Sequence, residues 1–312
     1  MNFKKLLDKQ KLSSPFESGT ELPKAIEFSK DALIYSRLSW EVVMRPLYYK
    51  HTGAKRRPGE HVYEVPNQFA TLRRDTGQYL GVVGTAYKIK QNSEVFEFFD
   101  KLTKKFNLHY KFAGYVRGGR MVYLIADGLA TIDLGKIGHI DTYLMVTNAH
   151  DGRNSVSVIA ILVHRETLSV ICIPPFIGKD RINFRHSIKE IKKADVFIEG
   201  IPDMTKKISD ILKKASSMKM DLLSMEKYLV TVLERKNVKQ ITAGDKMRNQ
   251  ILRNYTDGDG QYLLDMYLSS IYWMSHQREY KDNRSKLDNI VIFGRAQRMN
   301  WQYLNVVNQM LT

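Results

Sequence analysis

The stretch NSEVFEFFDKLTKKF, residues 92–106, decides the fold class. Its apolar residues recur every three or four positions, which brings them onto one face of an amphipathic helix. They are Val95, Phe98, Phe99, Leu102 and Phe106. The runs on either side, residues 79–89 and 109–116, are instead typical of strands. A helix set between strands predicts an α+β fold in which the helix packs on a sheet.

Further strand-like runs lie outward from this helix in both directions. They cover residues 40–49, 62–72 and 79–89 before the helix, and 109–116, 121–126, 142–148, 156–164 and 169–173 after it. Asp75-Thr76-Gly77 is a tight turn, so the first three runs predict an antiparallel meander. Pro174-Pro175 is expected to end the sheet region.

The last third of the chain changes character. Apolar residues with helical spacing predict helices near residues 208–215, 222–233, 261–280 and 296–311. We therefore expect an antiparallel β-sheet core with a packed helix, followed by a helical C-terminal third. In domain terms, this is an N-terminal arm (1–30), a β-rich α+β core (31–200) and a helical region packed on the core (201–312).

The charge of the chain is its most informative overall property. Lys and Arg number 49 against 33 Asp and Glu, a net charge of +16, and the two halves each carry +8. A spread excess of this size favours contact with a polyanion such as nucleic acid, although Lys-rich surfaces also serve solubility. No apolar run approaches the roughly 20 residues of a membrane span. We expect a cytoplasmic protein with no membrane partner.

Cysteine chemistry is largely excluded by composition. Cys172 is the only cysteine, which rules out an internal disulfide and a cysteine-cluster zinc site. It lies in the apolar run Val170–Ile173 and is expected to be a buried small hydrophobe. The chain has neither a nucleotide-binding glycine motif nor a G-x-S-x-G motif. We predict no catalytic residue, no metal and no cofactor.

Basic residues beside aromatic ones form the candidate nucleic-acid site. Arg117-Gly118-Gly119-Arg120 sets two guanidiniums beside a glycine turn, where the backbone can approach a phosphate closely. Tyr48, Tyr49, Tyr63, Phe69 and Tyr79 lie near further basic groups, a combination that suits stacked bases and paired phosphates. The alternative is that most of these rings belong to the core, with one or two exposed. The residues predicted to bind nucleic acid are Lys55, Arg56, Arg57, Arg73, Arg74, Arg117, Arg120 and Arg185.

The sharpest polar cluster is a predicted turn between two strands. It contains Asn148, His150, Asp151, Gly152 and Arg153. One interpretation is a phosphate or metal site, or a His–Asp acid/base pair. The other is a structural Asp-Gly hairpin turn whose side chains satisfy local backbone groups.

Ordered short motifs resemble those of the "phage/plasmid-like protein" family, a domain family of unassigned function. They are residues 72–77, 80–84, Tyr87, Ala113-Gly114, Gly118-Gly119-Arg120, Tyr143-Leu144, Asn148, His150-Asp151-Gly152, Phe184-Arg185-His186, Tyr272 and His276. The resemblance covers roughly residues 30–290 and implies an origin in a phage or mobile element. It adds weight to Arg120 and to the His150-Asp151-Gly152 turn.

Two features of that family are missing from this chain. The usual opening His-Gly-Leu-Gly element is absent, and Ile171-Cys172-Ile173-Pro174-Pro175 stands where relatives carry a polar Asn-Thr-Leu segment. Any role of that segment is therefore in doubt here.

Charge and motifs together predict a nucleic-acid-binding protein of phage or plasmid DNA metabolism. Single-stranded DNA binding or annealing by a homo-oligomer is the first choice, by analogy with the architecture of phage annealing proteins. One alternative is a metal- or His/Asp-dependent hydrolase that uses His150 and Asp151. The other is a non-enzymatic phage protein that binds a host factor.

Overall fold

The computed structural model describes residues 12–52, 60–135, 138–153, 156–184, 191–233 and 238–312. Two antiparallel sheets occupy the N-terminal part of the chain, and the last third is helical. The predicted α+β class is therefore confirmed. Among the described residues, no helix is both long and apolar enough to cross a membrane.

The larger sheet has seven strands. In spatial order these are β1 (Thr20–Glu21), β5 (His109–Val116), β6 (Met121–Asp133), β7 (His139–Ala149), β8 (Val156–His164) and β10 (Arg181–Phe184), with β9 (Ser169–Ile171) also paired to β8. All nine residues of β8 are buried. A strand buried on both faces reads as a continuous apolar run, because no side of it meets solvent.

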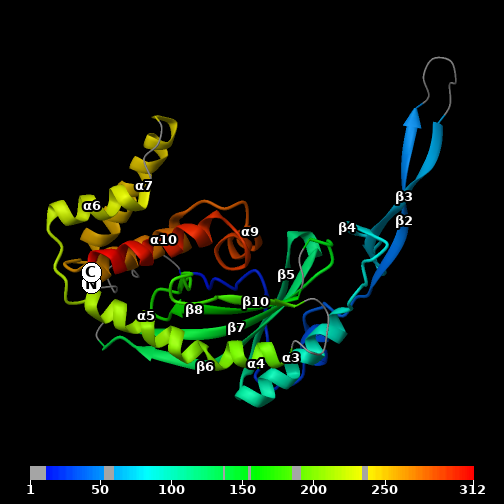
Figure 1. The fold of residues 1–312 in the computed structure, drawn as a ribbon, viewed down its shortest axis with the longest axis horizontal. Coiled ribbons are helices and arrows are strands. Elements are labelled where there is room, and N and C mark those ends of the chain that lie inside the picture. The colour runs from blue at the N-terminus through cyan, green and yellow to red at the C-terminus, as the bar shows by residue number, and fades with distance from the viewer. Residues whose placement is uncertain (1–11, 53–59, 136–137, 154–155, 185–190, 234–237) are drawn as a thin grey trace.

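The smaller sheet contains β2 (Val42–Thr52), β3 (Glu60–Arg73) and β4 (Tyr79–Gly84) in that order. This is the predicted meander, and Asp75-Thr76-Gly77 makes the turn between β3 and β4. The β2–β3 hairpin is much longer than β4, and its far half projects away from the rest of the molecule (Figure 1). We call residues 47–52 with 60–65 the arm.

The described part of the chain also contains helices, several of which cover the two faces of the larger sheet. They are α2 (Ser29–Tyr35), α3 (Asn92–Phe106), η1 (Arg117–Gly119), α4 (Ile191–Glu199), α5 (Ile201–Ala215), α6 (Leu222–Leu233), α7 (Val238–Asp257), α8 (Leu263–Tyr272), η4 (Trp273–Gln277), α9 (Asn283–Leu287), η5 (Asp288–Ile292) and α10 (Arg295–Met310). In Figure 1, α3, α4 and α5 run along one side of the sheet, and α9 and α10 lie on the other.

Helix α3 has the bounds predicted from its apolar spacing. Val95, Phe96, Phe99 and Leu102 are buried against the sheet. Asn107 ends the helix with a φ of 52°, a left-handed conformation that Asn tolerates better than most residues.

The prediction that the sheet region ends at Pro174-Pro175 is wrong. After a loop, the chain returns as β10, which pairs antiparallel with β8. Four residues on a sheet edge carry too little alternation to be recognised in the sequence. The N-terminal segment also contributes to the core, since Phe16 and Leu22 are buried and β1 pairs with β5.

Candidate nucleic-acid interface

The arm exposes aromatic side chains on both of its faces. Tyr48, Tyr49 and Tyr63 are 54%, 52% and 46% exposed. Tyr49 and Tyr63 are cross-strand partners, and their rings stack with centroids 5.5 Å apart and an interplanar angle of 27°. This cross-strand pair helps to stabilise the ribbon, while about half of each ring stays accessible to a ligand.

The hairpin also carries an excess of positive charge. Residues 42–74 hold seven Lys and Arg against two Glu, which is +5 of the net +16 in 33 of the 312 residues. Helix α3, in contrast, holds three Lys against three acidic residues and is neutral. The hairpin thus carries a net positive charge, whereas α3 does not.

An irregularity separates the arm from its base. The regular pairing breaks between Pro46 and Tyr48, and Asn67 on the opposite strand has a φ of 59°. Below this point, β3 pairs with both β2 and β4. Residues 47–52 continue above it for roughly 20 Å at about 3.3 Å per residue.

Two predicted arginines anchor the base of the hairpin. The guanidinium of Arg73 lies 4.6 Å from the centre of the Trp40 ring and forms an ion pair with Asp75 at 2.7 Å. Arg74 pairs with Glu41, although its side chain is largely exposed. Arg73, which is only 18% exposed, thus has partners within the chain.

Arg117 is held by the C-terminal region. Its Nε and Nη2 atoms donate to both carboxylate oxygens of Asp288 at 2.9 and 2.8 Å. Partial burial opposes the charge, but the Asp288 carboxylate raises the pKa of Arg117. The pair joins η1 of the β-rich core to η5, so Arg117 has a structural contact that spans the two parts of the chain.

Arg120 lies at the junction between the arm and the body. It is exposed, and its guanidinium carbon lies 5.5 Å from the centre of the Tyr79 ring. Tyr79 begins β4 and is 47% exposed. Of the two arginines in the predicted glycine turn, Arg120 is the one available to solvent.

Asn148 and His150 point into the protein and not toward solvent. Their exposed fractions are 1% and 0%. Nε2 of His150 lies 2.9 Å from Oδ1 of Asn92, and Nδ2 of Asn148 donates to the same oxygen at 3.1 Å. Burial lowers the pKa of His150 to about 4, with nearby Asp151 opposing the shift. At neutral pH the imidazole is therefore uncharged and enclosed.

The rest of this turn packs tightly on β4. A Cβ on Gly81 would lie 2.6 Å from Cα of Asp151, and one on Gly152 would lie 2.8 Å from Cγ1 of Val83. Gly152 also has a φ of 73°. Asp151 accepts a hydrogen bond from the backbone N–H of Arg153 at 2.9 Å, and the Arg153 side chain is exposed.

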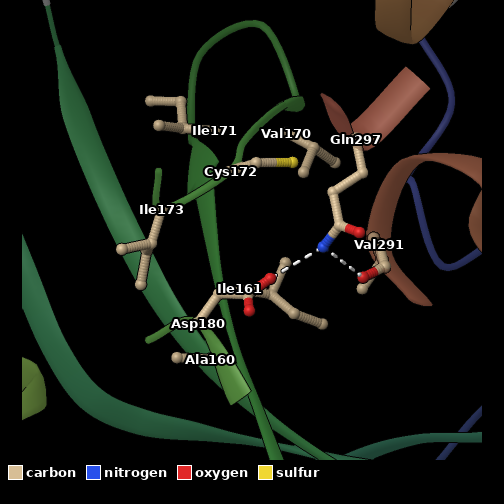
Figure 2. Close-up of a pocket in the computed structure, with 9 residues that line it drawn as sticks. All are labelled: Ala160, Ile161, Val170, Ile171, Cys172, Ile173, Asp180, Val291 and Gln297. Atoms are coloured by element: carbon tan, nitrogen blue, oxygen red, sulfur yellow. Dashed lines mark hydrogen bonds between the residues drawn. The ribbon is translucent and has the colours of Figure 1, made fainter. Parts of the chain in front are cut away.

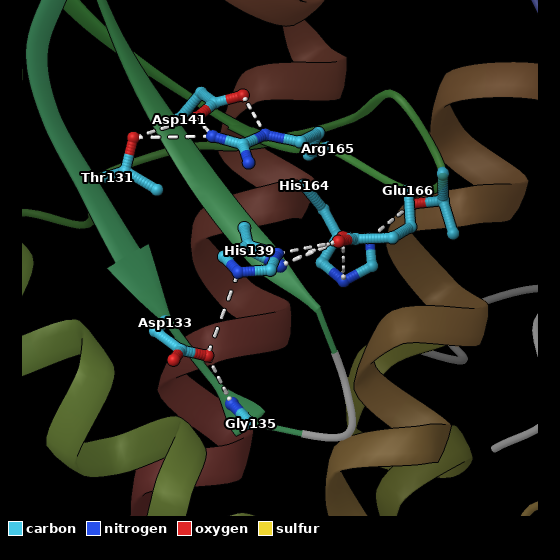
Figure 3. A network of polar contacts seen from close by, with 9 residues as sticks. Thr131, Asp133, Gly135, His139, Asp141, His164, Arg165 and Glu166 are labelled. Atoms are coloured by element: carbon cyan, nitrogen blue, oxygen red, sulfur yellow. Dashed lines mark hydrogen bonds and ion pairs between the residues drawn. The ribbon is translucent and has the colours of Figure 1, made fainter.

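A second polar network lies at the far end of the sheet (Figure 3). Nδ1 of His139 lies 2.9 Å from Glu166, whose other carboxylate oxygen is 3.5 Å from His164. Burial opposes ionisation of Glu166, but hydrogen bonds from the side chain and backbone of His139 lower its pKa. Arg165 pairs with Asp141 beside them. The network ties β7 to the β8–β9 turn.

The pocket around Cys172 is a small gap in the core (Figure 2). Its volume of about 10 Å³ has room for roughly one water molecule. Gln297 closes it by donating to Asp180 and to the carbonyl of Val291 at 2.7 and 3.2 Å. Cys172 is buried, as predicted, and burial raises the pKa of its thiol, which disfavours a nucleophilic role.

No group of three or more His, Cys, Asp or Glu residues within the described parts of the chain is arranged to hold a metal ion. Lys55, Arg56, Arg57 and Arg185, four of the predicted nucleic-acid contacts, lie outside the described residues. Of the predicted site residues, Arg120 and Arg153 are exposed beside the two ends of β4, at the junction of arm and body.

The family model of a domain of unknown function, DUF932, matches residues 79–312. The chain belongs to this family. The match begins at Tyr79, the first residue of β4, so the arm lies before it. Neither the curated proteins nor the solved structures contain a match to the chain.

Sequence reasoning missed the partners of the arginines. Asp288 lies 171 positions from Arg117 and has no local signal that links the two. Trp40 was recognised only as a residue of a strand-like run, while its ring in fact lies under Arg73. The exposed tyrosines were noted, since aromatic residues beside cations gave a signal.

Proposed function

We propose that this protein binds nucleic acid through the arm, with single-stranded DNA as the favoured ligand. The observation that carries the proposal is the projecting ribbon with Tyr48, Tyr49 and Tyr63 about half exposed, in a hairpin whose residues 42–74 carry a net charge of +5. Rings of this kind stack on unpaired bases, while cations meet the phosphates.

The proposal places this binding in the DNA metabolism of a phage or plasmid, in the cytoplasm of the host. Annealing requires a strand to be held extended with its bases accessible. Several arms in a row achieve this better than one, so we also propose a homo-oligomer. Light scattering with and without oligonucleotide, followed by an annealing assay, tests this part. A monomer that does not accelerate annealing would reduce the role to binding alone.

The hydrolase alternative draws no support from the geometry. His150 is fully buried, and its pKa of about 4 leaves it uncharged and without access to a substrate. Arg153 and Asp151 form a local turn contact and not an acid/base pair with it.

The binding test uses fluorescence anisotropy of a labelled single-stranded oligonucleotide at 50 mM salt. We expect Tyr49→Ala with Tyr63→Ala to weaken binding by about 2–6 kcal/mol, at about 1–3 kcal/mol for each lost stacking contact. Tyr35→Ala is the matched control, because Tyr35 is 54% exposed but lies on α2. Wild-type protein that does not bind at 50 mM salt would refute the proposal and favour a protein partner.

A further inference from the structure

The junction between the arm and the body presents a second exposed aromatic ring beside cations. We call Tyr79, Val82, Arg120 and Arg153 the platform. Tyr79 and Val82 of β4 are 47% and 38% exposed, and both arginine side chains are exposed. Arg120 lies over the Tyr79 ring, and β4 stands at the root of the arm in Figure 1. The whole platform falls within the family match of residues 79–312.

The backbone under the platform is fixed by contacts between distant segments. The N–H of His150 donates to the carbonyl of Arg120 at 2.8 Å, and Thr71 donates to the carbonyl of His150 at 2.7 Å. Nε2 of Gln78 donates to the carbonyl of Gly118 at 2.8 Å. A binding surface on rigid elements loses little freedom when its ligand arrives.

The tight packing of two glycines explains why these segments meet here. Gly81 lies against the backbone of Asp151, and Gly152 lies against Val83, at distances that leave no space for a side chain. Arg153 is thereby held at one end of β4 while Arg120 is held at the other. Tyr79 and Val83, beside which they lie, are four steps apart along β4, roughly 13 Å at about 3.3 Å per residue.

A cation stacked on a ring thus lies at one end of a short β-strand, and a second cation lies at the other end. Tyr79 can offer one face of its ring to a planar ligand while Arg120 lies against the other. A phosphate chain carrying exposed bases complements such a row, because the cations meet the phosphates and the ring meets a base. A base pair within a duplex keeps its faces stacked on its neighbours and cannot use the ring in this way.

We propose that the platform is a second binding site for single-stranded nucleic acid, in which Tyr79 stacks on one unpaired base and Arg120 and Arg153 bind the flanking phosphates. The inference rests on the proposed function, since the nucleic-acid strand that binds the arm would also contact the platform at the root of the arm. A nucleic-acid strand bound at both the arm and the platform would follow the hairpin from its exposed end toward the body.

The first experiment compares two labelled probes of equal length, an oligothymidine and its abasic counterpart, which keeps the phosphates but lacks bases. Tyr79→Ala should weaken binding of the oligothymidine by about 5- to 150-fold and leave the abasic probe nearly unchanged. Tyr79→Phe should bind as wild type because it keeps the ring. Tyr35→Ala, an equally exposed tyrosine on α2, should have no effect.

The second experiment tests the phosphate contacts. Arg120→Ala and Arg153→Ala should weaken both probes and lower the slope of log affinity against log salt by about 0.7 each. Arg253→Ala is the control, because Arg253 is 81% exposed but lies on α7.

The results separate this inference from the proposed function. If Tyr79→Ala binds as wild type while the Tyr49 and Tyr63 variants are weakened, the platform is refuted and the arm retains its role. An equal loss for both probes with Tyr79→Ala would contradict stacking. If wild-type protein binds neither probe, the proposed function itself fails.

Discussion

Strand β8 and the arm are both rich in residues that favour strands, but they lie in opposite environments. All nine residues of β8 are buried between neighbouring strands and helices. The tyrosines of the arm remain about half exposed. Burial of apolar surface explains why the residues of β8 stabilise the fold. It does not explain the tyrosines of the arm, which is why we assign them to binding.

The two regions also differ in how their charges are used. In the body, Arg117 is paired with Asp288, and His150 is kept neutral by burial. The hairpin collects +5 over residues 42–74 with only two acidic residues. Changes in the body should therefore alter stability, whereas changes in the arm should alter affinity for nucleic acid.

Removal of the arm should have the largest effect on binding. Pro46 and Phe69 are cross-strand partners, so Asn-Gly in place of residues 47–68 would close the hairpin with a two-residue turn. We expect affinity for single-stranded DNA to fall about 1,000-fold, because stacking contacts of about 1–3 kcal/mol each are lost together with four cations. The melting temperature should change by only a few degrees. A variant that unfolds would show that the arm supports the body.

A cavity in β8 should have the reverse effect. Ile159 is 1% exposed and pairs with β7 and β10. Ile159→Ala should lower the free energy of unfolding by about 3 kcal/mol in a urea titration. The affinity of the folded fraction for DNA should stay within twofold of wild type. A selective loss of binding would contradict the separation of the two regions.

Low pH should lower the free energy of unfolding through residues of the body and not through residues of the arm. Burial lowers the pKa values of His150 and His276 to about 4, from 6.5. Between these values the unfolded chain binds protons that the folded chain does not. The free energy of unfolding is therefore highest above pH 6.5, and the contribution of these neutral histidines is lost as the pH falls toward 4.

The expected loss at pH 5 is about 2 kcal/mol for each of these histidines. Urea titrations at pH 7 and pH 5 measure it. The variant that lacks the arm should lose the same amount, because both residues lie in the body. A smaller loss in that variant would mean that the arm contributes to the pH dependence.

The ion pair between Arg117 and Asp288 should have the smallest effect. It is partly exposed, so Arg117→Ala should destabilise the fold by about 1 kcal/mol while DNA affinity is maintained. Thermal melts and anisotropy measure the two quantities. Weaker binding without destabilisation would mean that Arg117 contacts nucleic acid, as the sequence predicts.

The spacing of apolar residues predicted the helices and turns that are determined by residues close in sequence. The helix at residues 92–106 and the turn at residues 75–77 were recognised because each carries its own local signal. The sequence also predicted strands over residues 40–72. The sequence could not indicate that the far half of this hairpin projects from the body. Alternation of apolar and polar residues predicts a strand, but it does not predict which elements pack on that strand.

The candidate site was predicted only in part, for a similar reason. His150 was a plausible acid/base residue until Asn92 and Trp40 were found against it, 58 and 110 positions away. Arg120 kept its exposed position, but the ring of Tyr79 beside it depends on how β4 packs against the 150–153 turn. Contacts between distant segments decide which polar residues reach solvent.

The most direct test of the β2–β3 hairpin against the body is a salt titration with two charge-matched variants. One carries Arg45→Gln and Lys50→Gln on β2, and the other carries Lys101→Gln and Lys104→Gln on exposed positions of α3. Each variant removes two positive charges. Affinity for a labelled single-stranded oligonucleotide is measured from 50 to 300 mM salt, and log affinity is plotted against log salt.

We expect the slope to fall by about 1.4 for the β2 variant, at about 0.7 for each lost phosphate contact, and to be unchanged for the α3 variant. Equal slopes for the two variants would mean that the total charge of the protein, and not the hairpin, drives binding. That result would contradict the central claim.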